Sequence, residues 1–223
     1  MIIIGLTGSI GMGKSTVSRQ FAALGAKVAN ADDFVHQLMK KDEVIAEISE
    51  VFPNAIIDKK IDRKILGQIV FADEKKRKIL EKILHPKVVE LEEKFVKKQQ
   101  KLGAKLVVLD IPLLFETGAD ARVDYTVVVS APKNVQRRRV LARAGMSVEK
   151  FERILKTQMP DSEKQKRADF IIPTGLGKAY SFREVRAFFI QAYTALNFGS
   201  CIKLYTSPCL PCVDLKQKRS INL

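Results

Sequence analysis

The stretch that decides the fold reads GSIGMGKS, residues 8–15, and it follows an apolar run, residues 2–6, that is typical of a buried strand. The pattern G-x-x-x-x-G-K-[ST] is that of a phosphate-binding loop. Its glycines let the backbone turn so that successive N–H groups point at phosphate oxygens, and a helix beginning near Lys14 directs its positive end at the same place. The alternative is a glycine-rich turn before an ordinary helix. The complete pattern, the preceding strand and the helix-forming continuation favour a nucleoside triphosphate site.

Two side chains of this loop carry chemistry that a triphosphate needs. Lys14 is predicted to meet the outer phosphates, and the hydroxyl of Ser15 is predicted to be a ligand of Mg²⁺. The predicted nucleotide-binding residues of the loop are Gly8, Ser9, Ile10, Gly11, Met12, Gly13, Lys14, Ser15 and Thr16.

The composition is that of an ordinary globular protein. The chain has 223 residues, of which 46% are hydrophobic, and this length allows one compact α/β core with insertions. No apolar stretch reaches the roughly 18 residues of a membrane span, and the N-terminus lacks the basic-then-apolar layout of a secretory signal. We therefore expect a cytoplasmic protein with no membrane partner.

The net charge of +14 does not by itself choose a partner. A nucleic acid, a membrane surface or a solvated basic surface around an anion site would each fit it. Much of the excess lies at residues 59–60, 75–78 and 97–98, in segments where lysine alternates with apolar residues at helical spacing. This spacing favours a solvated helix face, and the sequence has no aromatic and basic array of the kind that stacks bases. We therefore expect no nucleic-acid partner.

Apolar runs of strand type alternate with amphipathic helical segments, which is the pattern of a parallel sheet wrapped by helices. Strands are predicted at 2–6, 26–30, 105–110, 124–129 and 169–172. Helices are predicted at 14–24, 33–40, 43–51, 62–71, 74–101 with an interruption near Pro86, 132–144, 147–157 and 178–197. The residues at 181–184 read as a capping box of the last helix. These elements predict an α/β fold of three layers, with a parallel five-stranded sheet of the P-loop NTPase type.

The phosphate loop is accompanied by features of a small-molecule kinase. A GTP-binding switch would need a guanine-reading Asn-Lys-x-Asp, and the sequence contains no such tetrapeptide. The chain is short, has one nucleotide loop and carries a helical stretch between its second and third strands that is too long for a simple crossover. We expect this stretch to form a helical substrate-binding insertion, and the Arg-rich segment between the fourth and fifth strands to form a lid.

Two carboxylates follow predicted strands. Asp32 follows the second strand, and ligands of open parallel sheets bind outside the carboxyl ends of strands, so it is the candidate acid near the acceptor hydroxyl. The alternative for Asp32 or Asp33 is the N-cap of a helix that starts at Phe34. Asp110 closes the third strand, a usual position for a residue that holds Mg²⁺ directly or through water. Its alternative is a local turn network.

Cationic side chains are concentrated in the predicted lid. Arg139 and Arg143 are four residues apart on a predicted helix and so share one face. Guanidinium groups stay charged and can grip phosphate oxygens in bidentate fashion, which suits a transferring phosphoryl group. A solvated basic helix is the alternative, and it fits the neighbouring Arg137 and Arg138 better. His85, before Pro86, is by itself most often a structural or surface residue.

Together these segments resemble the dephospho-CoA kinase family, in order and spacing, over roughly residues 1–195. The Leu-His-Pro and Asp-Ile-Pro-Leu-Leu-Phe-Glu segments are the most specific, since many families share a phosphate loop. The matching segments are residues 5–15, Asn30-Ala31-Asp32, Leu84-His85-Pro86, residues 110–116, Gln136 with Arg139 and Arg143, Gln158, and residues 168–172.

The resemblance implies phosphorylation of the ribose 3′-hydroxyl of dephospho-CoA by ATP with Mg²⁺, giving coenzyme A and ADP in the last step of CoA synthesis. It implies that Asp32 is the base, that Arg139 and Arg143 reach the ATP phosphates, and that His85 lies on the substrate side. Asn30 stands where the family has a first acid. The implied catalytic residues are Asp32, Lys14 and Arg139. The other readings are a different nucleoside or small-molecule kinase, and a basic nucleic-acid-associated ATPase.

The resemblance predicts a kinase domain at 1–197, with a core at 1–32, 103–135 and 168–197, a helical substrate subdomain at about 33–102 and a lid at about 136–167. The tail, 198–223, has no family counterpart and holds all three cysteines, Cys201, Cys209 and Cys212. Its Cys-x-x-Cys could begin a zinc or redox site, but three thiols without a nearby histidine leave a tetrahedral site unfinished. We expect a tail that is disordered or has no part in activity.

Overall fold

The computed structural model describes the backbone of residues 1–198 and the side chains through Thr194. The three cysteines lie outside these residues, and so do residues 199–223, to which the expectation for the tail applies. Two compact units divide the chain: a core unit, made of residues 1–28 and the chain from Gln99 onward, and a helical unit, residues 29–98. Among the described residues, the structure has no helix long and apolar enough to cross a membrane.

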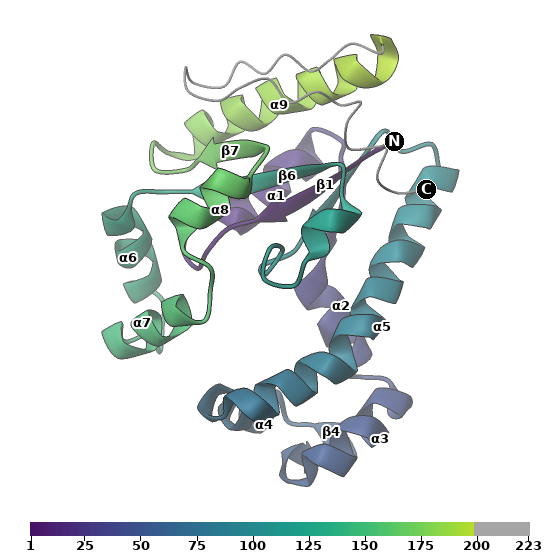
Figure 1. Cartoon of the computed structure of the whole chain (residues 1–223), viewed down its shortest axis with the longest axis vertical. Helices are drawn as coiled ribbons and strands as arrows, with labels where there is room; N and C mark the ends of the chain where they lie inside the picture. The colour runs from purple at the N-terminus through teal and green to yellow at the C-terminus, as the bar shows by residue number, and fades with distance from the viewer. Residues whose placement is uncertain (199–223) are drawn as a thin grey trace. The chain divides into compact units, whose positions relative to one another are not determined.

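A central sheet organises the core unit (Figure 1). Its strands lie in the order β2-β5-β1-β6-β7, and β1 pairs in parallel with both β5 and β6, while β6 pairs in parallel with β7. The strands are β1 (Ile2–Thr7), β2 (Lys27–Asn30), β5 (Leu106–Asp110), β6 (Tyr125–Ser130) and β7 (Phe170–Pro173). This confirms the prediction of an α/β fold around a five-stranded parallel sheet.

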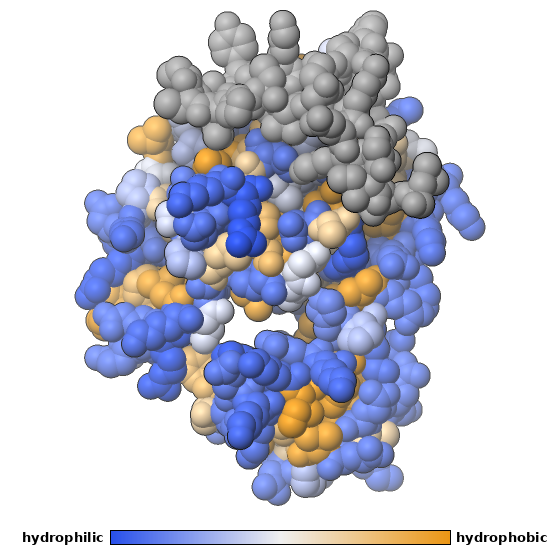
Figure 2. Space-filling view, in the orientation of Figure 1, coloured by the Kyte–Doolittle hydropathy of each residue, from blue (hydrophilic) through white to orange (hydrophobic). Residues whose placement is uncertain are grey.

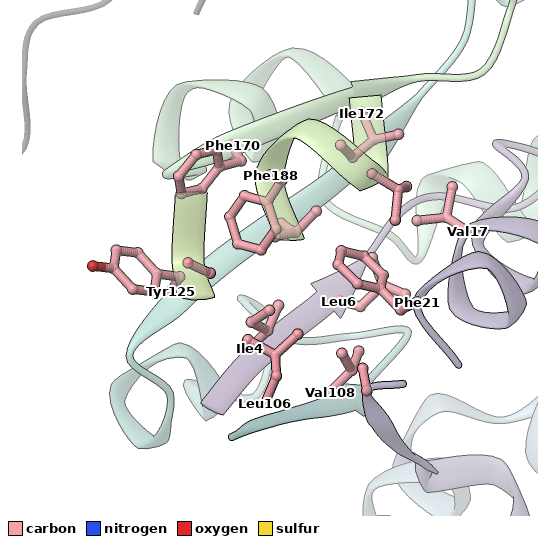
Figure 3. Close-up of a cluster of buried hydrophobic side chains, with 14 of the residues drawn as sticks. Ile4, Leu6, Val17, Phe21, Leu106, Val108, Tyr125, Phe170, Ile172 and Phe188 are labelled. Carbon is pink, nitrogen blue, oxygen red and sulfur yellow. The ribbon is translucent and has the colours of Figure 1, made fainter. Parts of the chain in front are cut away.

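Two helices, α1 (Lys14–Ala23) and α9 (Lys178–Phe198), cover one face of this sheet. Their apolar side chains meet those of alternate strand residues, since successive strand residues point to opposite faces. The rings of Phe170 and Phe188 pack edge to face with centroids 4.3 Å apart, and Phe21 packs against Phe188 at 5.8 Å. Figure 3 shows this buried cluster between the strands and the two helices.

The opposite face is covered by the chain that follows β5. Gly5 of β1 faces Leu114 and Val123 so closely that a Cβ there would lie 2.9 Å from Leu114 Cδ1. Of the remaining helices of the core unit, the first lies between β5 and β6 in the sequence and the other three lie between β6 and β7. They are the short 3₁₀ helix η2 (Ala119–Arg122), α6 (Lys133–Leu141), α7 (Val148–Lys156) and α8 (Asp161–Arg167).

The helical unit has its own apolar core, which contains Leu38, Ile48, Leu66 and Leu84. Its elements are α2 (Ala31–Leu38), α3 (Asp42–Val51), the 3₁₀ helix η1 (Pro53–Ala55), the hairpin β3 (Ile56–Ile57) and β4 (Lys60–Ile61), α4 (Arg63–Ala72) and most of α5 (Glu74–Lys101). Figure 2 shows hydrophilic residues over most of this unit, with a hydrophobic patch where Figure 1 draws β4 and α3.

The structure differs from the prediction at four local points. Helix α5 runs through Pro86 without interruption, and α8 and the β3–β4 hairpin were not predicted. The capping box is also absent at its predicted place, because α9 begins at Lys178 and Ser181 lies buried in its first turn, where its hydroxyl donates to the carbonyl of Lys178. The hairpin turn places Asp58 and Lys59 at positive φ without a glycine, so it carried none of the usual sequence signals.

Candidate functional site

The phosphate loop connects β1 to α1 in the predicted place. Gly13 is the N-cap of α1 with a φ of 95°, and the amides of Thr16 and Val17 both donate to its carbonyl. Within the described residues no side chain caps this helix and no acidic residue occupies its first turn. The amides of the first two helical residues, Lys14 and Ser15, have no intrahelical partner and are therefore available to an anion, which the partial positive charge of a helix N-terminus also favours.

Glycines let the loop lie close to its surroundings. A Cβ on Gly8 would lie 2.7 Å from the carbonyl oxygen of Val129. A Cβ on Gly11, which has a φ of 77°, would collide with Val140 and lie 3.1 Å from the carbonyl oxygen of Gln136. Any side chain at these two positions would push the loop away from β6 or from α6. The glycines are therefore required by close approach as well as by backbone conformation.

Lys14 forms an ion pair with Asp110, at the end of β5. The Asp110 side chain is only 2% exposed and that of Lys14 is 15% exposed, so each charge is compensated mainly by the other. The structure thus brings together two residues that the sequence assigned separately to phosphate and metal. Ser15, the other predicted metal ligand, is exposed at the start of α1.

Arg139 contacts the loop through Thr174, the residue after β7. Its guanidinium donates to Thr174 Oγ1 at 3.0 Å and to the Thr174 carbonyl at 2.7 Å, and Thr174 Oγ1 donates to the carbonyl of Met12 at 2.5 Å. Arg143 does not share this arrangement. Helix α6 ends at Leu141, so the prediction that Arg139 and Arg143 lie on one helical face is wrong, and Arg143 is exposed in the following turn.

The predicted site residues of the helical unit lie on α2 and α5. The side chain of Asn30 caps α2 by accepting from the amide of Asp32 at 2.9 Å, and Asp32 itself is exposed in the first turn. The alternative that Asp32 or Asp33 caps a helix starting at Phe34 is therefore wrong. His85 is exposed on α5.

An ion pair that the sequence did not predict joins the segment after β5 to α8. Lys164 is 0% exposed and contacts Glu116 at 2.9 Å, and the same Glu116 oxygen accepts from the amide of Met159 at 2.8 Å. Lys164 also donates to the carbonyl of Pro112 at 3.4 Å. A fully buried lysine in a helix of seven residues leaves no periodic pattern from which its burial could be predicted.

This ion pair predicts an asymmetric response to substitution. Glu116→Gln keeps the oxygen that Met159 uses but leaves the Lys164 ammonium buried and uncompensated, so we expect a loss of about 3–5 kcal/mol in the free energy of unfolding. Lys164→Met should cost less, because the remaining Glu116 side chain is 19% exposed and water can reach it. Urea unfolding of both variants measures the difference. An equal or larger loss for Lys164→Met would contradict this account.

The sheet order, the phosphate loop at the end of β1 and the Lys14–Asp110 pair define a phosphate-loop kinase of the α/β class. The family model described as dephospho-CoA kinase matches residues 2–176. The chain therefore belongs to the dephospho-CoA kinase family, as its resemblance to that family predicted.

Curated relatives and solved structures agree with this assignment. The dephospho-CoA kinase of Mesorhizobium japonicum is 48% identical over 84% of this chain and 94% of its own length, and that of Rhizobium etli is 46% identical over 88% and 95%. Protein TT1252 from Thermus thermophilus superposes with a TM-score of 0.74 at 37% identity, covering 85% of this chain and 97% of its own. A dephospho-CoA kinase from Campylobacter jejuni superposes with a TM-score of 0.57 at 31% identity, covering 85% and 96%.

Proposed function

We propose that the chain transfers the γ-phosphoryl group of ATP to the ribose 3′-hydroxyl of dephospho-CoA, giving coenzyme A and ADP, in the cytoplasm and without a nucleic-acid or membrane partner. The observation that carries this proposal is the Lys14–Asp110 pair beside the uncapped N-terminus of α1, in a chain of this family. The pair offers a cation for phosphate oxygens and a carboxylate for a metal ion.

The loop has the properties that a triphosphate requires. The amides of Lys14 and Ser15 can donate to phosphate oxygens, and Lys14, the first residue of the same helix, adds its ammonium group. Glycines at 8, 11 and 13 leave the backbone uncovered, so that a phosphate can approach it closely. These features support the assignment of residues 8–16 to the nucleotide.

The oxygen atoms of Ser15 and Asp110 suit Mg²⁺. The described residues contain no group of three or more histidine, cysteine, aspartate or glutamate side chains that could hold a metal. This fits Mg²⁺, which is usually held by one or two protein ligands together with substrate phosphates. When bound, the ion neutralises charge that develops on the transferring group.

We assign a separate role in the reaction to each of the predicted site residues. We propose that Asp32 accepts the proton of the 3′-hydroxyl while the hydroxyl oxygen forms a bond to the γ-phosphorus. At the same time the bond between the γ-phosphorus and the oxygen that bridges it to the β-phosphate breaks, and ADP leaves. Lys14 exchanges Asp110 for the outer phosphates and stabilises the charge that moves to the leaving oxygen. Arg139, held by Thr174, adds a second cation, and Arg143 and His85 are assigned to nucleotide and substrate by family position alone.

The other two readings are a kinase for a different small molecule and a basic ATPase that acts with nucleic acid. Some lysines of α5 and α8 pair with an acid three or four residues away, as in Lys78–Glu74, Lys94–Glu90 and Lys166–Glu163. Such pairs partly offset the positive charge of these helices, and the family model described as dephospho-CoA kinase matches residues 2–176. Both observations favour dephospho-CoA over nucleic acid.

A coupled assay of ADP release separates the three readings. Purified chain is incubated with ATP and Mg²⁺, and dephospho-CoA, adenosine, nucleoside monophosphates or DNA is added singly. We expect ADP to form only with dephospho-CoA and Mg²⁺ together, with a product heavier by one phosphoryl group, because positioning of the acceptor dominates the rate. Equal turnover with DNA, or without dephospho-CoA, would overturn the proposal.

A further inference from the structure

One residue of the phosphate loop, Ile10, is held on both of its backbone polar groups by glutamine side chains. Its amide donates to Gln158 Oε1 at 3.0 Å, and its carbonyl accepts from Gln136 Nε2 at 2.8 Å. Gln136 lies on α6 and is 5% exposed, while Gln158 follows α7 and is half-buried. The two glutamines therefore flank the segment 137–157, which carries Arg139 and Arg143.

These bonds fix the direction of the backbone within the loop. The amide of Ile10 is used by Gln158, so it cannot also serve a phosphate. The carbonyl of Ile10, which carries the negative end of a peptide dipole, points at Gln136. A carbonyl turned toward the phosphates would repel them, so the Gln136 bond keeps this oxygen away from an incoming anion.

Other contacts, from α6 and from the residues that follow β6 and β7, hold the same part of the loop. Gly11 lies against Val140 and the backbone of Gln136, so α6 rests directly on the loop. The sulfur of Met12 accepts from the amide of Ala131 at 3.2 Å, and the carbonyl of Met12 accepts from Thr174. The two glutamines are thus part of a set of contacts that holds the backbone of residues 10–12 in place.

We propose that Gln136 and Gln158 are positioning residues for the nucleotide phosphates: they hold the loop in its anion-binding shape before ATP arrives and tie both ends of the arginine-bearing segment to Ile10. This rests on the proposed use of ATP. A loop ordered in advance pays less conformational entropy on binding, so loss of either glutamine weakens ATP binding without changing the binding of the acceptor.

The test measures MgATP binding to the full chain by titration calorimetry, without acceptor. Gln136→Leu and Gln158→Leu each leave one partly buried polar group of Ile10 unpaired, so each should weaken ATP binding about five- to tenfold. The double variant should weaken it by less than the product of the two, since both act on one residue. Gln20→Leu is the matched control, because Gln20 donates to Lys178 and Ser181 and not to the loop.

Steady-state kinetics separates positioning from general damage to the fold. We expect a raised KM for ATP and a KM for dephospho-CoA within about twofold of wild type, whereas a general loss of structure would move both. If the leucine variants do not fold, Gln136→Asn and Gln158→Asn, which keep the amide but shorten it by one methylene, are measured instead and should weaken ATP binding about threefold.

The possible failures are distinguishable. ATP binding by the variants that matches the Gln20→Leu control, or an equal rise in both KM values, overturns the positioning role. Wild-type chain that binds MgATP but does not phosphorylate dephospho-CoA overturns the proposed acceptor and leaves the glutamine result standing. Wild-type chain that does not bind ATP overturns both.

Discussion

Replacing Lys14 with methionine should lower kcat by on the order of 10²–10³-fold, because the variant lacks the cation to which we assign the stabilisation of charge on the outer phosphates in the transition state. Methionine nearly preserves the volume of the side chain. A coupled assay of ADP release at saturating ATP and dephospho-CoA measures the effect. Lys133→Met, at an exposed lysine of α6 in the same unit, is the control and should retain wild-type activity.

The stability of the Lys14 variant carries a second test. Asp110 is 1% exposed, so losing Lys14 leaves a buried carboxylate uncompensated and should destabilise the fold by about 3–5 kcal/mol. The double variant Lys14→Met, Asp110→Asn removes both charges and should recover most of this loss while remaining inactive. A Lys14→Met enzyme with near-normal kcat would rule out the loop as the site of reaction.

Replacing Asp32 with asparagine should lower kcat by about 10²–10³-fold, since positioned general bases contribute about 10²–10⁴-fold and phosphoryl transfer depends mainly on positioning and charge. Asparagine keeps the shape of the side chain but is far less basic. Because Asn30 caps α2 and Asp32 is exposed, we expect the melting temperature to change little. ATP binding should stay within a few fold, as measured by calorimetry.

Asp33 provides the matched control for this substitution. It is the next residue, it is also exposed in the first turn of α2, and Asp33→Asn removes the same charge from the same helix N-terminus. Each substitution should cost the helix about 0.3–1 kcal/mol of stability. Equal kcat values for the two variants would show that Asp32 acts through charge near α2, and the base would then have to be sought at Asp33 or Asp110.

The sheet and the phosphate loop could be predicted because their signals are local in the sequence. A strand shows as a short apolar run, and the loop shows as glycines and Lys14 at fixed spacing, so neither depends on distant residues. The end of α6 was predicted three residues too late, since the turn at Gly145, with a φ of 72°, follows apolar and basic residues that also suit a helix.

The side-chain contacts that hold the phosphate loop could not be predicted in the same way. Gln136 and Gln158 lie 126 and 148 residues from Ile10, and both were recognised as family positions without a role. A glutamine that binds a distant backbone group has the same sequence context as one that faces water. Lys164 is similar, since only the folded chain brings Glu116 to it. Contacts of this kind depend on tertiary structure, for which a single sequence gives no periodic signal.

The Lys14–Asp110 pair also has a consequence for the order of ligand binding. Together the two charges of the pair cancel. An anion that binds Lys14 alone leaves the buried Asp110 carboxylate without a compensating charge, and a cation that binds Asp110 alone leaves the Lys14 ammonium without one. A nucleotide arriving as its magnesium complex supplies one partner to each group at once. The binding free energies of the nucleotide and of the metal ion are therefore coupled, and each ligand should raise the affinity for the other by the same factor. Nucleotide alone and metal alone should both bind weakly.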